Sequence, residues 1–119
     1  MQKLSNQILD LRELEKLSTN LCKARPVGDI YLVQGELGAG KTTLVKLLIN
    51  NLYLLNNLSK PASIASPTFP ILITYDLNSS QIYHYDLYRI KNLKELEELD
   101  FFENLNNNIT FIEWPEMLI

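Results

Sequence analysis

A glycine-rich segment constrains this chain more than any other feature: residues 35–42 read G-E-L-G-A-G-K-T. They satisfy the pattern G-x-x-x-x-G-K-[ST] of phosphate-binding loops, known as Walker A. Because glycine lacks a Cβ, Gly35, Gly38 and Gly40 permit backbone conformations and close approaches that other residues forbid. Successive backbone N–H groups can then point inward and bind an anion together with Lys41. The sequence therefore predicts a phosphate-binding loop.

The segments that flank this loop have the pattern that it requires. Residues 30–34 are a short β-rich apolar run, typical of a buried parallel strand. Residues 42–55 are rich in Leu, Val and Ile and predict a buried helix, whose N-terminus would reinforce the anion site. The hydroxyl of Thr42 is suited to Mg²⁺. Because a strand precedes the motif and a helix follows it, an accidental glycine turn is a poor explanation for it.

The rest of the chain favours one α/β domain over residues 1–119. Hydrophobic residues make up 46% of the 119, which suffices for one core and leaves no room for a second substrate domain. We expect a three-layer domain of the P-loop NTPase type with a mixed, mainly parallel sheet. Its further elements are an amphipathic helix, the two strands of a β-hairpin, a short acidic helix and a last buried strand, expected at residues 4–21, 67–77, 81–86, 93–102 and 109–112.

Two acidic residues follow the predicted inner strands. Asp86 comes after Ile82-Tyr83-His84-Tyr85, and Glu113 comes after the strand at residues 109–112. In an open α/β sheet the ligand lies beyond the carboxyl ends of the parallel strands. Asp86 is a candidate acid near Mg²⁺ or for positioning water, and Glu113 a candidate Mg²⁺ ligand. Two alternatives remain open. Asp86 could cap the segment that follows it, and Glu113 could be a solvated acid at a strand end.

Three further residues are ambiguous on sequence grounds. Thr68, in Ser66-Pro67-Thr68, could reach a γ-phosphate from a switch-like loop, although a strand-entry turn is the simpler interpretation. His84 lies in mid-strand between tyrosines, which favours a structural over a catalytic imidazole. Trp114 could cover a nucleotide or pack against the edge of the sheet.

Charge and composition limit the classes of partner. The net charge is −3, and no basic patch is visible, so direct gripping of nucleic acid is not expected. The single Cys22 gives no internal disulfide and no metal cluster. No apolar run approaches the roughly 20 residues that span a bilayer, and no signal peptide is visible, so a cytoplasmic protein without a membrane partner is expected.

Four segments of the chain form a recognisable set. They read G-E-L-G-A-G-K-T-T, S-P-T-F, Y-H-Y-D-L-Y-R and I-E-W-P-E, at residues 35–43, 66–69, 83–89 and 112–116. Taken together, they resemble the TsaE (YjeE) family. The resemblance covers about residues 29–116, and its motifs are specific as a set, whereas each one other than the phosphate loop is weak alone.

The resemblance implies an ATPase that supports the threonylcarbamoyladenosine modification of tRNA at adenosine 37. Its members are expected to work with the proteins TsaB and TsaD, to contact tRNA only indirectly, and to hydrolyse ATP slowly without those partners. Carried over position by position, Thr42 and Glu113 would bind Mg²⁺, and Lys41 and Asp86 would serve hydrolysis. The residues expected to bind ATP are Gly35, Gly38, Ala39, Gly40, Lys41, Thr42, Thr43, Thr68 and Trp114.

One departure and two alternatives accompany this interpretation. The family normally continues into further strands after the Glu-Trp-Pro-Glu segment, whereas this chain ends at Ile119 and is C-terminally short by comparison. A small-molecule or nucleotide kinase would share the phosphate loop but needs a lid, and the three arginines, Arg12, Arg25 and Arg89, form no lid-like cluster. A nucleotide-binding interaction module without turnover is the second alternative.

Overall fold

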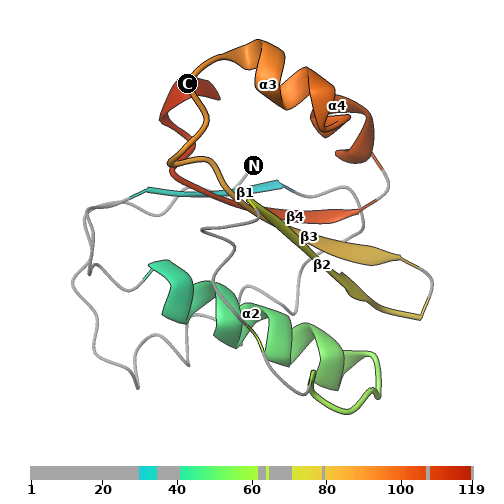
Figure 1. Cartoon of the computed structure of the whole chain (residues 1–119). Coiled ribbons are helices and arrows are strands. Elements are labelled where there is room, and N and C mark those ends of the chain that lie inside the picture. The colour runs from blue at the N-terminus through green and yellow to red at the C-terminus, as the bar shows by residue number, and fades with distance from the viewer. Residues whose placement is uncertain are drawn as a thin grey trace.

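A computed structural model of the chain describes residues 30–34, 41–61, 64, 71–78, 80–106 and 108–118 (Figure 1). The described residues form a four-stranded sheet in the order β1-β4-β3-β2. Strands β1, β4 and β3 are parallel, and β2 pairs antiparallel with β3 as a hairpin. The expected mixed, mainly parallel sheet is therefore confirmed. The strands, β1 to β4, span Ile30–Val33, Leu72–Asp76, Gln81–Asp86 and Ile109–Glu113.

Helices cover both faces of this sheet. The helix α2, Lys41–Leu55, lies across one face, and α3, Leu93–Glu98, with α4, Phe101–Asn104, lies on the other (Figure 1). A 3₁₀ turn at Glu116–Leu118 follows β4. The three layers match the α/β fold that the sequence predicted. None of the helices in the described part of the chain is long and apolar enough to cross a membrane.

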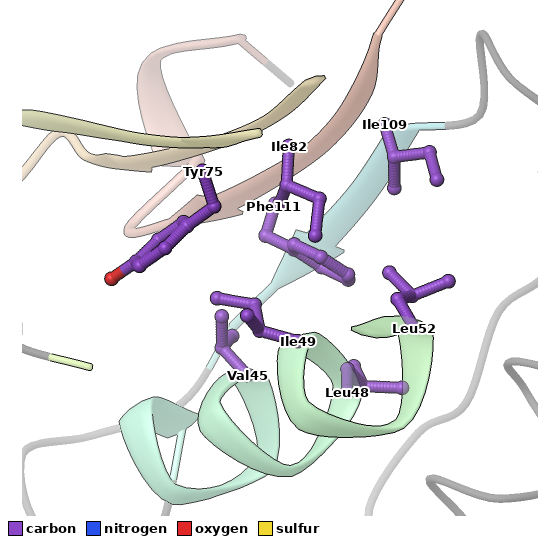
Figure 2. Packing of buried hydrophobic residues seen from close by; sticks show 8 residues of the cluster. All are labelled: Val45, Leu48, Ile49, Leu52, Tyr75, Ile82, Ile109 and Phe111. Atoms are coloured by element: carbon purple, nitrogen blue, oxygen red, sulfur yellow. The ribbon is translucent and has the colours of Figure 1, made fainter. Parts of the chain in front are cut away.

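The helix α2 packs through one apolar stripe. Its buried aliphatic residues recur every three or four positions, which places them along one side of the helix. Alternate residues of β3 and β4 face them, so Ile82 and Phe111 project toward the helix from neighbouring strands (Figure 2). The cluster consists of Val45, Leu48, Ile49, Leu52, Tyr75, Ile82, Ile109 and Phe111. The sequence predicted a buried helix, and the structure buries this one face while Leu54 and Leu55 remain exposed.

A second cluster lies on the other face of the sheet. The intervening residues Tyr85 of β3 and Ile112 of β4 pack there against Leu96 and Phe101 of the two short helices. The rings of Tyr85 and Phe101 lie 4.8 Å apart at 66°, an edge-to-face contact. Burial raises the pKa of the Tyr85 hydroxyl to about 12. The strict alternation along β3 and β4 thus builds two cores from one sheet.

The acidic segment at residues 93–102 was expected as one helix and is two. The carboxamide of Asn92 accepts from the backbone N–H of Glu95 at 3.1 Å and caps α3 at its start. The chain then breaks at Asp100, whose φ of 53° is left-handed. Aspartate tolerates this conformation better than most residues. The break allows Phe101 to turn into the core, a tertiary preference that helical periodicity does not reveal.

The first strand also differs from expectation. All four residues of β1 are half-buried and not fully buried. This strand is outermost among the described strands and pairs only with β4 there, whereas every residue of the central β4 is buried.

The core under α2 should dominate stability. Ile49 is fully buried, at 0% exposure, so Ile49→Ala is expected to lower the unfolding free energy by about 2–5 kcal/mol through lost burial and a residual cavity. Leu54→Ala, in the same helix at 52% exposure, is the control and should cost about 0.5 kcal/mol or less. Urea unfolding measures both, and equal losses would contradict the packing described.

Candidate functional site

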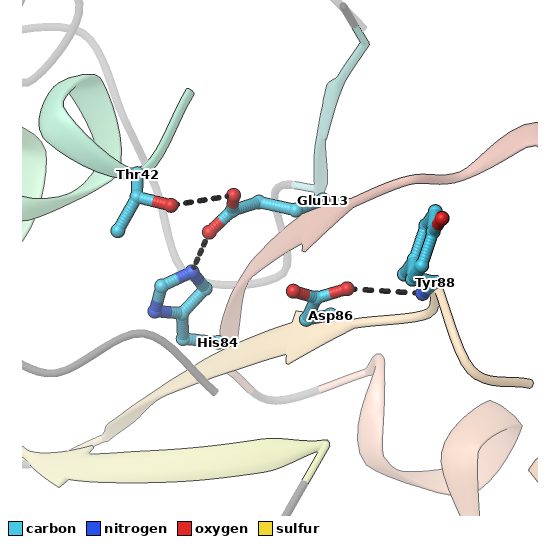
Figure 3. Close-up of polar contacts among 5 residues, drawn as sticks. All are labelled: Thr42, His84, Asp86, Tyr88 and Glu113. Atoms are coloured by element: carbon cyan, nitrogen blue, oxygen red, sulfur yellow. Dashed lines mark hydrogen bonds and ion pairs between the residues drawn. The ribbon is translucent and has the colours of Figure 1, made fainter. Parts of the chain in front are cut away.

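The parallel register of β3 and β4 brings the two predicted acids together. Asp86 and Glu113 are register partners at the last position of their strands. Side chains of paired residues in parallel strands project to the same face, here the face that α2 covers. The helix begins at Lys41 beside these strand ends (Figure 3). The sheet therefore assembles one site from three segments that are far apart in the sequence.

The contact between Thr42 and Glu113 joins the start of α2 to the end of β4. The hydroxyl of Thr42 donates to Oε1 of Glu113 at 2.8 Å (Figure 3). Glu113 is only 2% exposed, so the carboxylate lies inside the protein and not in solvent. The solvated acid that the sequence left open as an alternative is therefore wrong. A hydroxyl and a carboxylate oxygen are hard ligands of the kind that Mg²⁺ prefers.

His84 makes the second contact with this carboxylate. Its Nε2 lies 2.6 Å from Oε2 of Glu113, and its side chain is fully buried (Figure 3). Sequence reasoning favoured a structural role and did not connect the two residues. A signal was present, because His84 and Asp86 are two apart in one strand and so must share a face.

These neighbours set the pKa of Glu113. Burial raises the pKa of this carboxyl, but hydrogen bonds from His84 and Thr42, with the charges of His84 and Lys41, outweigh burial. The net result is a pKa below the ordinary value of 4.5. The two hydrogen bonds and the nearby positive charges therefore favour the ionised form of this buried carboxyl.

Asp86 occupies the neighbouring position with 5% exposure. Its Oδ1 accepts from the backbone N–H of Tyr88 at 2.9 Å, which ties the carboxylate to the turn after β3. The carboxylate thus caps the turn that follows the strand, and capping of the next segment is the alternative that the sequence left open. It also fixes the side chain at the strand end next to Glu113.

Lys41 and Trp114 form a cation–π contact at the same end of the sheet. The ammonium Nζ lies 3.5 Å from the centroid of the indole ring. Tyr88 packs on Trp114 with ring centroids 4.9 Å apart. Lys41 is 8% exposed, and its charge lies against the indole ring and acts on the buried Glu113.

Not all predicted site residues can be placed. Thr43 lies exposed in the first turn of α2. Lys41, Thr42, Asp86, Glu113 and Trp114 gather as described above. The predicted phosphate-loop and switch residues, Gly35, Gly38, Ala39, Gly40 and Thr68, lie outside the described residues, so their roles stay predictions.

The donor set suits a cation that brings other ligands with it. No group of three or more His, Cys, Asp or Glu that could hold a metal ion occurs within the described ranges. Mg²⁺ commonly takes one or two protein oxygens and completes its shell with waters and substrate phosphates. Thr42 and Glu113 fit that mode, and the charge of Lys41 acts on the same carboxylate.

The lowered pKa of Glu113 makes stability depend on pH. A carboxyl with a depressed folded-state pKa adds stability that is fully present above 4.5 and is lost as pH falls through the folded value. We therefore expect Glu113→Gln to cost more stability at about pH 7 than at about pH 3. Glu98→Gln, at an exposed helical position, is the control and should show no such change. Denaturant unfolding at each pH measures the difference, and an equal cost at both pH values would contradict the assignment.

The chain is similar to a protein-family model and to curated proteins. The model described as threonylcarbamoyl adenosine biosynthesis protein TsaE matches residues 8–119. Among similar curated proteins, the tRNA threonylcarbamoyladenosine biosynthesis protein TsaE of Rickettsia felis is 42% identical over 106 residues, which cover 89% of this chain and 59% of the relative. The protein of the same name in Rickettsia bellii is 40% identical over 124 residues, covering 99% of this chain and 80% of the relative.

Two further comparisons extend this result. A TsaE of Synechocystis is 39% identical over 114 residues, covering 92% of this chain and 68% of the relative. The crystal structure of Bacillus subtilus YdiB aligns with a TM-score of 0.60 at 21% identity, covering 92% of this chain and 63% of that one. This likeness supports the P-loop NTPase-like fold. The chain spans less than two thirds of the length of the Rickettsia felis relative.

Proposed function

The chain belongs to the TsaE family of threonylcarbamoyl adenosine biosynthesis proteins, and from this premise we propose that it binds and hydrolyses ATP with Mg²⁺ in support of the threonylcarbamoyladenosine modification of tRNA at adenosine 37. The observation that carries the proposal is the hydrogen bond between Thr42 and Glu113 at 2.8 Å. It aligns the last residue of the phosphate-loop motif with a strand-end carboxylate, as a Mg²⁺–nucleotide site requires.

The residues would divide the work as follows. Lys41 and the loop amides of residues 35–40 would hold the phosphates, and Thr42 with Glu113 would hold Mg²⁺. When bound, the ion neutralises charge on the phosphate oxygens. Asp86, beside Glu113, orients the attacking water and accepts its proton as the γ-phosphate is released.

The partners follow from the same family. We propose homologues of TsaB and TsaD as the proteins that this ATPase serves, with tRNA held by them and not by this chain. The net charge of −3 supports this division, because an acidic protein gains little from contact with a polyanion.

Lys41 provides the first test of nucleotide binding. We expect Lys41→Ala to weaken ATP binding about tenfold to a hundredfold, since a charged hydrogen bond to phosphate is lost. Lys46→Ala, farther along the same helix, is the matched control and should retain wild-type affinity. Isothermal titration calorimetry with Mg²⁺ present measures both. Equal affinities for the two variants would remove Lys41 from the site.

Turnover in the presence of partners provides the second test. We expect ATP hydrolysis by the chain to rise on addition of TsaB and TsaD, and Asp86→Asn to reduce the stimulated rate about a hundredfold or more through loss of general-base chemistry. Phosphate release is the measurement. Phosphorylation of a small acceptor without those partners would instead favour a kinase and overturn the proposal.

A further inference from the structure

The buried pair of His84 and Glu113 goes beyond what the proposed function explains. His84 is the single histidine of the chain. It lies in the middle of β3, fully buried, and touches a carboxylate that is itself 2% exposed. Nothing in Mg²⁺ or phosphate binding by Thr42, Lys41 and Glu113 requires an imidazole behind the carboxylate.

The proton positions in this contact follow from its chemistry. Nε2 of His84 lies 2.6 Å from Oε2 of Glu113 and donates to it where Glu113 is a carboxylate, because an ionised oxygen only accepts. The other ring nitrogen, Nδ1, is buried and has no hydrogen-bond partner among the described residues. Among the described residues, the imidazole therefore makes its one hydrogen bond with Glu113.

That contact fixes the rotation of the carboxylate. His84 donates to Oε2 from β3, and Thr42 donates to Oε1 from α2, so each oxygen of Glu113 is held from a different element (Figure 3). Two donors on opposite oxygens define the plane of the group. With His84 on Oε2, the oxygen turned toward Thr42 and the start of the helix is Oε1.

We propose that His84 is a positioning residue that holds Glu113 with Oε1 directed at the Mg²⁺–nucleotide position. The proposal rests on the proposed function for the identity of the ligand. Its physical basis is that a rigid, hydrogen-bonded carboxylate loses less conformational freedom when it meets a cation, whereas a carboxylate with one donor can rotate away.

Two substitutions separate positioning from packing. In His84→Gln the amide Nε2 is as many bonds from Cα as the imidazole Nε2, so the donor is kept. In His84→Leu the donor is lost and apolar bulk remains. Thr110→Val, at a fully buried position of β4 that does not touch Glu113, is the matched control for disturbing the centre of the sheet.

The measurement is nucleotide affinity by calorimetry at several Mg²⁺ concentrations. We expect His84→Leu to need at least about tenfold more Mg²⁺ than the wild type to reach the same nucleotide affinity. Without Mg²⁺, this variant should bind nucleotide as the wild type does. His84→Gln should recover most of the lost Mg²⁺ response. Thr110→Val should keep the Mg²⁺ dependence. Equal weakening of both His84 variants, with and without Mg²⁺, would mean a structural role and overturn the inference.

A spectroscopic readout tests the contact without any ligand. Because the chain has one histidine, imidazole N–H signals in the ¹H NMR spectrum of the ¹⁵N-labelled protein can come only from His84. We expect a strongly downfield, exchange-protected signal that moves upfield or disappears in Glu113→Gln. Absence of that signal in the wild type would refute the contact. If the signal is present but nucleotide binding by the wild type does not depend on Mg²⁺, the proposed function is wrong, and the inference is wrong with it. If the wild type depends on Mg²⁺ and His84→Leu depends on it equally, only the inference is wrong.

Discussion

The charge of Glu113, buried at the end of the central strand, is the constraint on which the site depends. An isolated carboxylate inside a protein is costly, and it persists only where donors and nearby positive charges compensate. Here Thr42 and His84 donate to its two oxygens, and the pKa remains below its ordinary value in spite of burial. The chain therefore maintains a negative charge at the place where a cation with phosphates would be bound.

The hydrophobic core determines where these donors lie. Thr42 reaches Glu113 because α2 packs its apolar stripe on residues of β3 and β4, and Val45 lies one turn beyond Thr42 in that stripe. The same alternation that turns Phe111 toward the helix turns Glu113, two residues later, toward it as well. Apolar and polar positions thus follow one strand period, and a shift of register would disrupt the core and the site together.

Much of this arrangement could be predicted from residue patterns. The strand–loop–helix order, the hairpin and the position of both acids at strand ends follow from local periodicity and turn signals. The break at Asp100 could not, because the burial of Phe101 against Tyr85 decides it. The contact of His84 with Glu113 was missed for a related reason. Strand alternation places each residue on a face, but only the parallel register of β3 and β4, which pairs Asp86 with Glu113, brings His84 and Glu113, 29 positions apart, into contact.

Trp114 shows how the chain completes the site after β4 ends. Its φ of 56° is left-handed, a conformation that costs a non-glycine residue about 1 kcal/mol or more. At this bend the indole lies over the ammonium of Lys41 at 3.5 Å and against the ring of Tyr88. A cation–π contact and an aromatic pair offset such a cost. Trp114 follows Glu113 directly in the chain. The bend that places the indole over Lys41 therefore begins at the residue that carries the buried carboxylate, so one short segment positions both the acid and the aromatic ring.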